Sequence, residues 1–233
     1  MNLKKSITVV VPALNEEDNI QAAIKNVIEA VSGHWDDYEV LVMNDGSTDR
    51  TGVLAEEMAK NNPKIRVVHN ERNLGYGTSY RKAVGLASKE YISIFAGDNE
   101  ISAMFLRDFL PNLGDVDFVT SYPSTTHKRV WLRRFLSKTF INTMNFIFRL
   151  KLRCYTGAFV YRVSLVRSIP IKSDGLMLLP ECLVRLIKAG HRFRQVPFEY
   201  IGRKGGKSTA LSSKNLLGGV RVLLILMKDI YFQ

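Results

Sequence analysis

The strongest constraint on the fold is a pattern repeated in the first half of the chain, where three short apolar runs each end at a cluster of acids and amides. The runs cover residues 7–11, 40–43 and 91–95. Runs of four to eight β-branched and apolar residues are typical of strands buried on both faces, as in parallel sheets. Because ligands bind at the carboxyl ends of strands in an open parallel sheet, we expect the three clusters to meet in one crevice. Such a crevice suits a cation together with a ligand rich in hydroxyl groups.

Helical and strand patterns alternate through the first hundred residues. Residues 18–31 carry apolar side chains at the 3.6-residue period of an amphipathic helix. Further helices are predicted over 51–60 and 78–88, and a further strand over 65–69. This alternation predicts an α/β fold with a mostly parallel sheet flanked by helices.

The second half has a different pattern. It predicts helices over 130–152, 177–189 and 215–231, strands over 157–161 and 193–200, and a basic loop rich in Gly and Ser over 203–214. No linker composition separates the halves, so we predict one domain over residues 1–214 and an amphipathic carboxyl-terminal helix over 215–233.

The charge is distributed unevenly along the chain. The net charge is +11, but residues 1–120 hold 12 basic and 18 acidic residues, whereas residues 121–233 hold 21 basic and 4 acidic residues. The basic half points to anionic partners such as phosphates, a membrane surface or nucleic acid. A nucleic-acid-binding protein is one alternative, although the first half is acidic and contains no nucleic-acid motif. The two cysteines form no disulfide framework and no metal-ligand spacing, which predicts a reducing compartment.

The acids at the strand ends are candidates for a ligand site. Asp98 and Glu100 lie two residues apart, so in extended backbone they point to one side and could share a hard divalent cation that also binds a diphosphate. Asp45 at the second strand end could accept hydrogen bonds from a base or a ribose, and Glu16 occupies the equivalent place on the first strand. The structural alternatives are a solvated acidic turn and acids favoured at a helix amino terminus.

Glycine spacing gives a weaker signal. Gly75 and Gly77 form a G-x-G that follows the third strand and lacks the third glycine of a dinucleotide-binding loop. We interpret these glycines as positions where the backbone approaches a ligand or a neighbouring element. A nucleotidyltransferase is a further alternative, but it would place a glycine-rich basic loop after the first strand, where residues 14–18 are acidic.

Four motifs in the first half, taken in order and spacing, resemble the family 2 glycosyltransferases of GT-A fold. They are residues 12–19 (PALNEEDN), 44–51 (NDGSTDRT), 73–77 (NLGYG) and 97–100 (GDNE). The second half resembles the dolichyl- and polyprenyl-phosphate sugar transferases within that family. The segments that carry this second resemblance are 134–142, 156–162 and 196–208.

The resemblance implies an inverting glycosyltransferase that moves a sugar from a UDP- or GDP-sugar to a lipid phosphate. It implies a donor half over 1–120 and an acceptor half over 121–214. The residues implied to contact the base and ribose are Pro12, Leu14, Glu16 and Asp45, and those implied to meet donor or acceptor phosphates are Arg134, Arg203 and Ser208. Asp98 and Glu100 would hold Mg²⁺ or Mn²⁺ on the diphosphate, and Asp98 and Glu181 are the catalytic candidates.

The chain departs from the family pattern at several positions. Ala96 stands where the metal motif usually has its first aspartate, and residues 153–155 replace an acid often found before the Ser-Gly-Phe segment. Glu181 lies near a position where many members carry an acid, and it is a base, a group that orients an arginine, or an acid at a helix start. An acceptor that is a glycan or another cell-envelope sugar is the alternative to a lipid phosphate, and Glu181 would then be the base.

Two predicted helices combine aromatic or leucine side chains with lysine and arginine, over residues 130–152 and 215–231. Helices of this type can lie in an anionic membrane interface, and the alternative is a core-facing stripe with a solvated basic face. No apolar run reaches the roughly 18 residues that span a bilayer. We therefore expect a cytoplasmic protein attached peripherally to the cytoplasmic face of a membrane, or a partner subunit that supplies the anchor.

Overall fold

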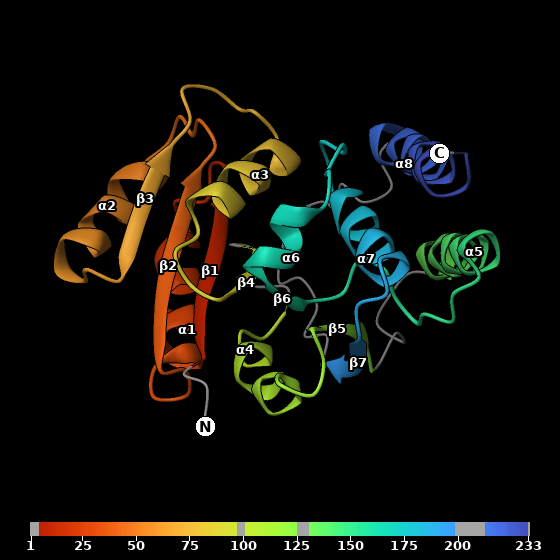
Figure 1. Cartoon of the computed structure of the whole chain (residues 1–233). Helices are drawn as coiled ribbons and strands as arrows, with labels where there is room; N and C mark the ends of the chain where they lie inside the picture. The colour runs from red at the N-terminus through yellow and green to blue at the C-terminus, as the bar shows by residue number, and fades with distance from the viewer. Residues whose placement is uncertain (1–4, 97–100, 125–130, 199–212, 233) are drawn as a thin grey trace.

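The computed structural model describes residues 5–96, 101–124, 131–198 and 213–232, and it contains one seven-stranded sheet with helices on both faces (Figure 1). The strands are β1 (Ser6–Ala13), β2 (Asp37–Asn44), β3 (Ile65–His69), β4 (Tyr91–Ile94), β5 (Phe118–Pro123), β6 (Phe159–Arg162) and β7 (Phe193–Phe198), in the spatial order β3-β2-β1-β4-β6-β5-β7. All neighbours pair in parallel except β6, which is antiparallel to both β4 and β5. The predicted α/β fold with a mostly parallel sheet is confirmed.

Two hydrophobic clusters cover the two faces of the sheet. One contains side chains of α1 (Ile20–Val31), α2 (Thr51–Asn61) and α4 (Phe105–Asp108), which the short 3-10 helix η1 (Leu110–Asn112) follows. The other contains side chains of α3 (Tyr76–Leu86), α5 (Trp131–Phe148), α6 (Val163–Ser168), α7 (Leu178–Lys188) and α8 (Ser213–Tyr231). Figure 1 shows α5 and α8 together at one end of the sheet and α2 with β3 at the other.

The continuous apolar runs follow from this burial on both faces. In β1, Val9 and Val11 face the first cluster and Val10 faces the second, and all three are at most 1% exposed. Side chains alternate across a strand, so a strand between two helical layers needs apolar residues at successive positions. The same burial on α1 falls at the helical period that the sequence predicts, with Ile20, Ala23, Ile24, Val27, Ala30 and Val31 buried.

The second half differs from expectation at strands β5 and β6 and at helices α5 and α6, and the sequence did not predict α6 (Val163–Ser168). Strand β5 has no counterpart among the predicted elements, because its buried centre includes Thr120 and Ser121, and Ser121 Oγ donates to the Ala158 carbonyl oxygen (3.0 Å) instead of packing as an apolar group. The strand predicted over 157–161 is β6, at Phe159–Arg162. Helix α5 ends before residue 152, because Arg149 takes a φ of 49° and leaves the helical conformation.

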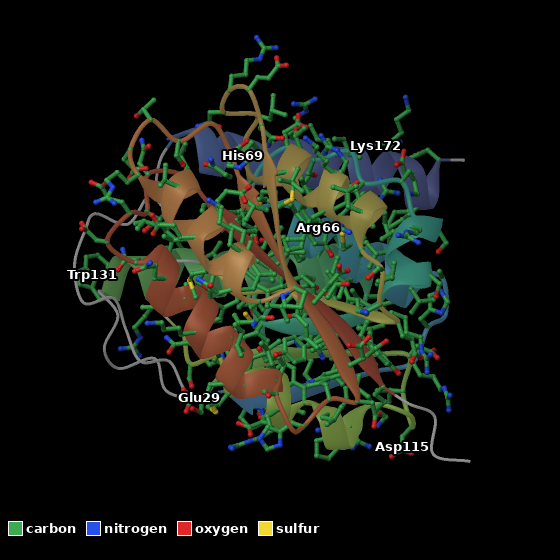
Figure 2. All side chains as sticks on the ribbon, turned by 90° about the vertical axis from the view of Figure 1, so that its left-hand side faces the viewer. Glu29, Arg66, His69, Asp115, Trp131 and Lys172 are labelled. Atoms are coloured by element: carbon green, nitrogen blue, oxygen red, sulfur yellow. The ribbon has the colours of Figure 1, made fainter. Side chains whose placement is uncertain are left out.

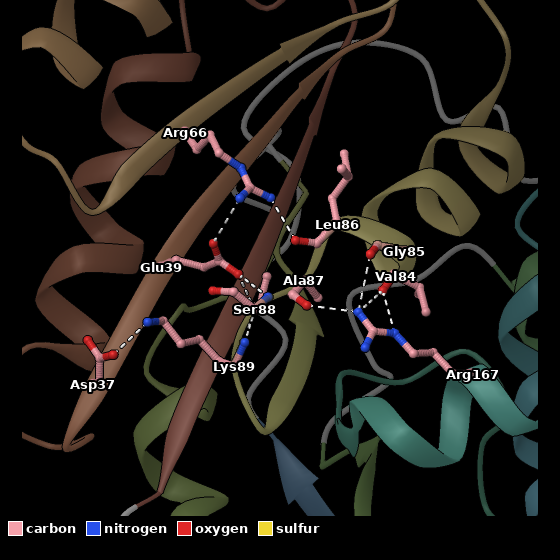
Figure 3. Close-up of polar contacts among 11 residues, drawn as sticks. Asp37, Glu39, Arg66, Val84, Gly85, Leu86, Ala87, Ser88, Lys89 and Arg167 are labelled. Carbon is pink, nitrogen blue, oxygen red and sulfur yellow. Dashed lines mark hydrogen bonds and ion pairs between the residues drawn. The ribbon is translucent and has the colours of Figure 1, made fainter.

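A polar network closes the amino-terminal edge of the sheet (Figure 3). Glu39 at the start of β2 is 8% exposed, and its Oε1 accepts hydrogen bonds from the Ser88 N–H (2.6 Å) and from Thr8 Oγ1 (2.7 Å). Burial alone would raise the pKa of Glu39, but these bonds and the nearby Arg66 outweigh it and hold the pKa below its ordinary value. The turn between α3 and β4 is thereby fixed to β1 and β2.

Arg167 on α6 closes the carboxyl end of α3, as Figure 3 also shows. Its guanidinium donates to the carbonyl oxygens of Val84 (2.9 Å), Gly85 (3.2 Å) and Ala87 (2.8 Å). The last carbonyl groups of a helix have no partner within the helix, so an arginine that binds three of them both satisfies and anchors that end. This contact joins the second half of the chain to the first.

We expect Arg167→Met to lower the free energy of unfolding by about 1–2 kcal/mol, because three carbonyl oxygens lose a charged donor. Urea denaturation at pH 7 measures this change. Arg107→Met is the matched control, since the Arg107 guanidinium pairs with the neighbouring exposed Asp108 and such pairs contribute little. Equal stability of the two variants would contradict the anchoring role of Arg167.

Candidate functional site

The loops that follow β1 and β2 are joined by hydrogen bonds at the carboxyl edge of the sheet. Asn15, with a φ of 53°, accepts the Thr48 N–H at its Oδ1 (2.9 Å) and donates its own N–H to Ser47 Oγ (3.0 Å). Further hydrogen bonds of this kind link the Glu16 N–H to Thr51, the Glu17 N–H to Asp49, and the Arg50 N–H to Glu17. The two loops, residues 14–19 and 45–50, therefore form one frame, which we call the loop frame.

Asp45 adds the loop after β3 to this frame. Its side chain is buried; Oδ1 accepts hydrogen bonds from Asn70 Nδ2 (2.8 Å) and the Leu74 N–H (2.9 Å), and Oδ2 accepts the Gly75 N–H (2.9 Å). Burial alone would raise the pKa of Asp45, but the donors from Leu74, Asn70, Ser79 and Gly75 outweigh it and hold the pKa below its ordinary value. A carboxylate has about four acceptor positions, so these four donors from the chain account for all of them.

Asn70 is a site residue that the sequence reasoning missed. Its Nδ2 also contacts Ser79 Oγ (3.0 Å), and its Oδ1 accepts from Lys82 Nζ (2.8 Å), which brings a cation next to the Asp45 cluster. The signal was present, because Asn70 directly follows β3 just as the acids and amides follow the other strands. Asn70 and Lys82 link the frame to α3.

Gly46 lets the third loop cross close to the second. Its φ is +75°, and a Cβ built there would lie 2.6 Å from the Arg72 carbonyl carbon and 2.7 Å from the Asn73 nitrogen. Both the backbone conformation and the crowding exclude a side chain at this position. The loops after β2 and β3 are therefore in direct backbone contact.

Gly77 makes the equivalent approach to the second half of the chain. Its N–H donates to the Asp174 carbonyl oxygen (2.9 Å), and a Cβ there would lie 2.5 Å from the Asp174 carbonyl carbon. Arg81 reinforces this contact by pairing with the Asp174 carboxylate (2.8 Å) and donating to the Ser173 carbonyl oxygen (2.6 Å). The close approach expected at this glycine is to a neighbouring element.

The other residues predicted at the donor site lie around the loop frame. Pro12 is half-buried near the end of β1, and Leu14 is 40% exposed just beyond it. Glu16 is half-buried, and its Oε2 accepts a hydrogen bond from Asn19 Nδ2 (2.9 Å). The structure therefore brings Pro12, Leu14, Glu16 and Asp45 to the same edge of the sheet, and their contact with a nucleoside stays a prediction.

The predicted metal residues follow β4, the strand beside β1. The Phe95 N–H donates to the Val10 carbonyl oxygen (2.9 Å), which extends the pairing of the two strands to the edge where the loop frame lies. Asp98 and Glu100 come two and four residues after Ala96 and lie outside the described residues. Among the residues that are described, no group of three or more His, Cys, Asp or Glu side chains could hold a metal ion.

Glu181 is fully buried in the first turn of α7. Its carboxylate accepts the N–H groups of Lys172 (3.0 Å) and Ser173 (2.8 Å) and pairs with Arg185 (2.8 Å). Arg185 in turn pairs with Asp229 of α8 (2.6 Å), to which Lys172 Nζ also donates (2.6 Å). These contacts are those of a structural brace between α7, α8 and the preceding loop, and a role for Glu181 as a base stays a prediction.

The predicted phosphate-binding residues belong to the second half. Arg134 is exposed on the first turn of α5. Arg203 and Ser208 lie outside the described residues. The structure therefore places one of these three residues and leaves the phosphate contacts as predictions.

Comparisons with known proteins agree on one family. The model described as glycosyl transferase family 2 matches residues 8–169. The uncharacterized glycosyltransferase EpsJ of Bacillus subtilis is 33% identical over 102 residues, which cover 43% of this chain and 28% of that protein. The putative teichuronic acid biosynthesis glycosyltransferase TuaG of Bacillus subtilis is 28% identical over 99 residues, covering 42% of this chain and 38% of that protein. The chain thus matches less than half the length of these curated relatives.

Solved structures support the fold. Glucosyl-3-phosphoglycerate synthase from Mycobacterium tuberculosis in complex with UDP matches with a TM-score of 0.72 and 20% identity, over 94% of this chain and 80% of that one. The same enzyme with Mn²⁺, UDP and glucosyl-3-phosphoglycerate also gives a TM-score of 0.72, over 97% of this chain and 80% of that one. These likenesses confirm the GT-A fold.

We expect Gly46→Ala to destabilise the protein by about 2–4 kcal/mol, because it combines a left-handed conformation with a collision against the third loop. Gly33→Ala is the matched control: its φ is +73°, but nothing lies within 4 Å of the added Cβ, so it should cost only about 1–2 kcal/mol. Urea denaturation of both variants isolates the crowding. If Gly46→Ala and Gly33→Ala lowered the free energy of unfolding equally, the loop after β3 would be able to move away from the added Cβ without cost.

Proposed function

The chain belongs to glycosyl transferase family 2, and we propose that it transfers a sugar, with inversion, from a UDP- or GDP-sugar to a polyprenyl phosphate at a membrane surface. The observation that carries the donor part is the loop frame. Three loops of acids and amides meet at the carboxyl edge of the sheet, where open α/β folds bind their ligands. The neighbouring strand β4 ends at the same edge, and Asp98 and Glu100 follow it in the sequence.

In this proposal the nucleoside lies over the loop frame. Pro12 and Leu14 contact the base, and Glu16 and Asp45 meet base or ribose donors. Buried polar groups of fixed geometry discriminate strongly between ligands that can and cannot complete their hydrogen bonds. Asp45 is fixed by four such donors from the chain, so its carboxylate is held in a defined direction.

A divalent cation fits the donor that we propose. Asp98 and Glu100 would hold Mg²⁺ or Mn²⁺, which neutralises the charge that develops on the leaving nucleotide diphosphate. Ala96 leaves the cation without a third carboxylate, so water and the diphosphate would complete its coordination. The support comes from the solved relatives, since glucosyl-3-phosphoglycerate synthase was crystallised with Mn²⁺ or Mg²⁺ and UDP.

The state of Glu181 favours a phosphate acceptor over a sugar hydroxyl. A sugar hydroxyl needs a base, whereas a lipid phosphate is already an anion near pH 7. Glu181 is fully buried, and both of its oxygens are engaged by backbone N–H groups and Arg185, so it is poorly placed to take a proton from a substrate. Arg134, Arg203 and Ser208 are the proposed partners of the donor and acceptor phosphates.

Helices α5 and α8 supply the proposed membrane contact. They lie side by side, since the Tyr231 hydroxyl donates to the Ile147 carbonyl oxygen (2.7 Å) and the Tyr231 ring stacks on Phe148. Trp131, Phe135 and Phe146 share one face of α5 and are 74%, 61% and 86% exposed, and Figure 2 shows Trp131 at the margin of the molecule. The exposed apolar residues of α8 include Val220 and Leu224, and exposed Phe232 follows its last residue. The exposed basic residues of the two helices include Arg134, Lys138, Arg221 and Lys228, and exposed Arg149 directly follows α5.

This composition is that of helices that lie in an anionic membrane interface. Within the described ranges, no helix is long and apolar enough to cross a bilayer. We therefore propose peripheral attachment to the cytoplasmic face of a membrane, either directly or with a membrane-anchoring subunit.

The proposed donor site is tested by thermal melting with UDP-, GDP- and dTDP-sugars, each with and without Mn²⁺. A nucleotide sugar that binds the native state should raise the melting temperature in the presence of Mn²⁺, by mass action. Asp98→Ala should remove the Mn²⁺-dependent part of the shift and lower turnover at least a hundredfold, while the unliganded melting temperature stays the same.

Asp115→Ala is the control for that variant. Asp115 is exposed and lies at the opposite end of the molecule from His69, which ends β3 at the loop edge (Figure 2). Full Mn²⁺-dependent turnover in Asp98→Ala would overturn the metal assignment, and the absence of a shift with every nucleotide sugar would overturn the donor site.

The membrane contact predicts co-sedimentation with anionic vesicles at low salt and release at high salt, since part of the attraction is electrostatic. Phe146→Ser should weaken vesicle binding about tenfold, because one aromatic side chain no longer inserts. Val53 is exposed on α2, at the other end of the sheet, and Val53→Ser should leave vesicle binding unchanged. A wild-type chain that stays in the supernatant at low salt would rule out direct attachment.

A further inference from the structure

A hollow of about 430 Å³ lies between the β5–β7 end of the sheet and the segment that follows α5. Its lining residues are Tyr122, Lys151, Leu152, Arg153, Phe193 and Gln195. Two of these are cations and none is an acid. The hollow is open to solvent on one side, so a ligand could enter without rearrangement of the fold.

The hollow extends along β5 and β7, from Phe193 at the start of β7 to Tyr122 near the edge of the sheet where the loop frame lies. Strand β5 is antiparallel to β6, which is antiparallel to β4, so β5 and β4 run in the same direction and end at the same edge. Tyr122 is the second-last residue of β5. Two strand spacings separate β5 from β4, a distance of about 10 Å, and the hollow lies on the far side of β4 from the nucleoside loops.

The two cations of the hollow are available to an anion. None of the ion pairs in the described part of the chain involves Lys151 or Arg153. The Arg153 guanidinium lies over the Tyr122 ring, 4.6 Å from its centre, an arrangement that orients the guanidinium and leaves its charge unneutralised.

The segment that carries Arg153 is fixed in place. Gln195 on β7 accepts the Arg153 N–H at its Oε1 (2.9 Å) and donates its Nε2 to the Cys154 carbonyl oxygen (2.9 Å). On the other side, Asn145 binds both the N–H and the carbonyl oxygen of Leu152 (2.9 Å each). A segment held at both ends positions its cation before a ligand arrives, which reduces the entropic cost of binding.

We propose that this hollow binds the phosphate of the acceptor, with Arg153 as the bidentate partner and Lys151 as a second positive charge. This assignment rests on the proposed function, which requires a binding place for the phosphate of the acceptor. The apolar side chains of Leu152 and Phe193 line the same hollow and would contact the first carbons of the lipid. The nucleoside and the acceptor would then occupy opposite sides of β4.

Calorimetric titration of the full chain with farnesyl phosphate, glycerol 3-phosphate and farnesol tests the proposal. The phosphates should bind and farnesol should not, and Arg153→Gln should weaken phosphate binding at least tenfold through loss of a charged bidentate contact. Arg194→Gln is the matched control, because Arg194 lies on the opposite face of β7 and donates to Asn112 (2.9 Å). The circular dichroism melting curve and the UDP–Mn²⁺ thermal shift of Arg153→Gln should equal those of the wild type.

The phosphate site would be ruled out if the wild-type chain did not bind phosphate, or if Arg153→Gln left binding unchanged. It would also be ruled out if Arg153→Gln and Arg194→Gln weakened binding equally, because binding would then depend only on the net charge of the chain. The source of the phosphate is decided separately. If glycerol 3-phosphate binds as tightly as farnesyl phosphate and still depends on Arg153, the hollow stands and the polyprenyl part of the proposed function fails.

Discussion

The hydrogen bonds of the Asp45 carboxylate hold together the loops at the carboxyl edge of the sheet. A parallel sheet delivers its loops to one edge, but nothing in the sheet itself holds one loop against the next. Asp45 does this by accepting two backbone N–H groups and the Asn70 amide from the loop after β3. Backbone groups in a buried loop need partners, and a carboxylate that supplies them replaces the ladder of a strand.

The two edges of the sheet use polar groups in different ways. At the amino-terminal edge, Glu39 and Arg167 use their side chains to form hydrogen bonds with the backbone around the end of α3. At the carboxyl edge, the loop frame leaves Leu14 exposed and Glu16 half-buried. The contrast agrees with the proposed function, in which the amino-terminal edge stabilises the fold and the carboxyl edge binds the donor. The charge split along the sequence follows a different direction, since the basic half contributes α5, α8 and the hollow at the β5–β7 end of the sheet.

Much of the first half could be predicted from the sequence, because strands buried on both faces require continuous apolar runs and amphipathic helices require a 3.6-residue period. Strand β5 could not, since Thr120 and Ser121 interrupt the short apolar run that Phe118 and Val119 begin, and Ser121 is buried through its hydrogen bond to the Ala158 carbonyl oxygen. The direction of β6 could not either, because its partners β4 and β5 are distant in sequence and pairing direction has no local signal. At the site, the position of Asp45 at a strand end was predictable. The hydrogen bonds that Asn70, Leu74 and Gly75 donate to it were not, because they depend on the path of the loop after β3, which composition does not encode.

The carboxylate of Asp229 has a consequence for the order in which the chain can complete its fold. Lys172 and Arg185 both pair with it, and Arg185 is nearly buried, so two cations of the second half depend on a residue more than forty positions later. Until α8 docks, Arg185 has Glu181 alone and part of the α7 surface remains uncovered. Domains are synthesised from the amino terminus, so the first half can assemble while this pairing waits for the last helix. Helix α8 therefore acts as the closing element of the core as well as part of its outer surface.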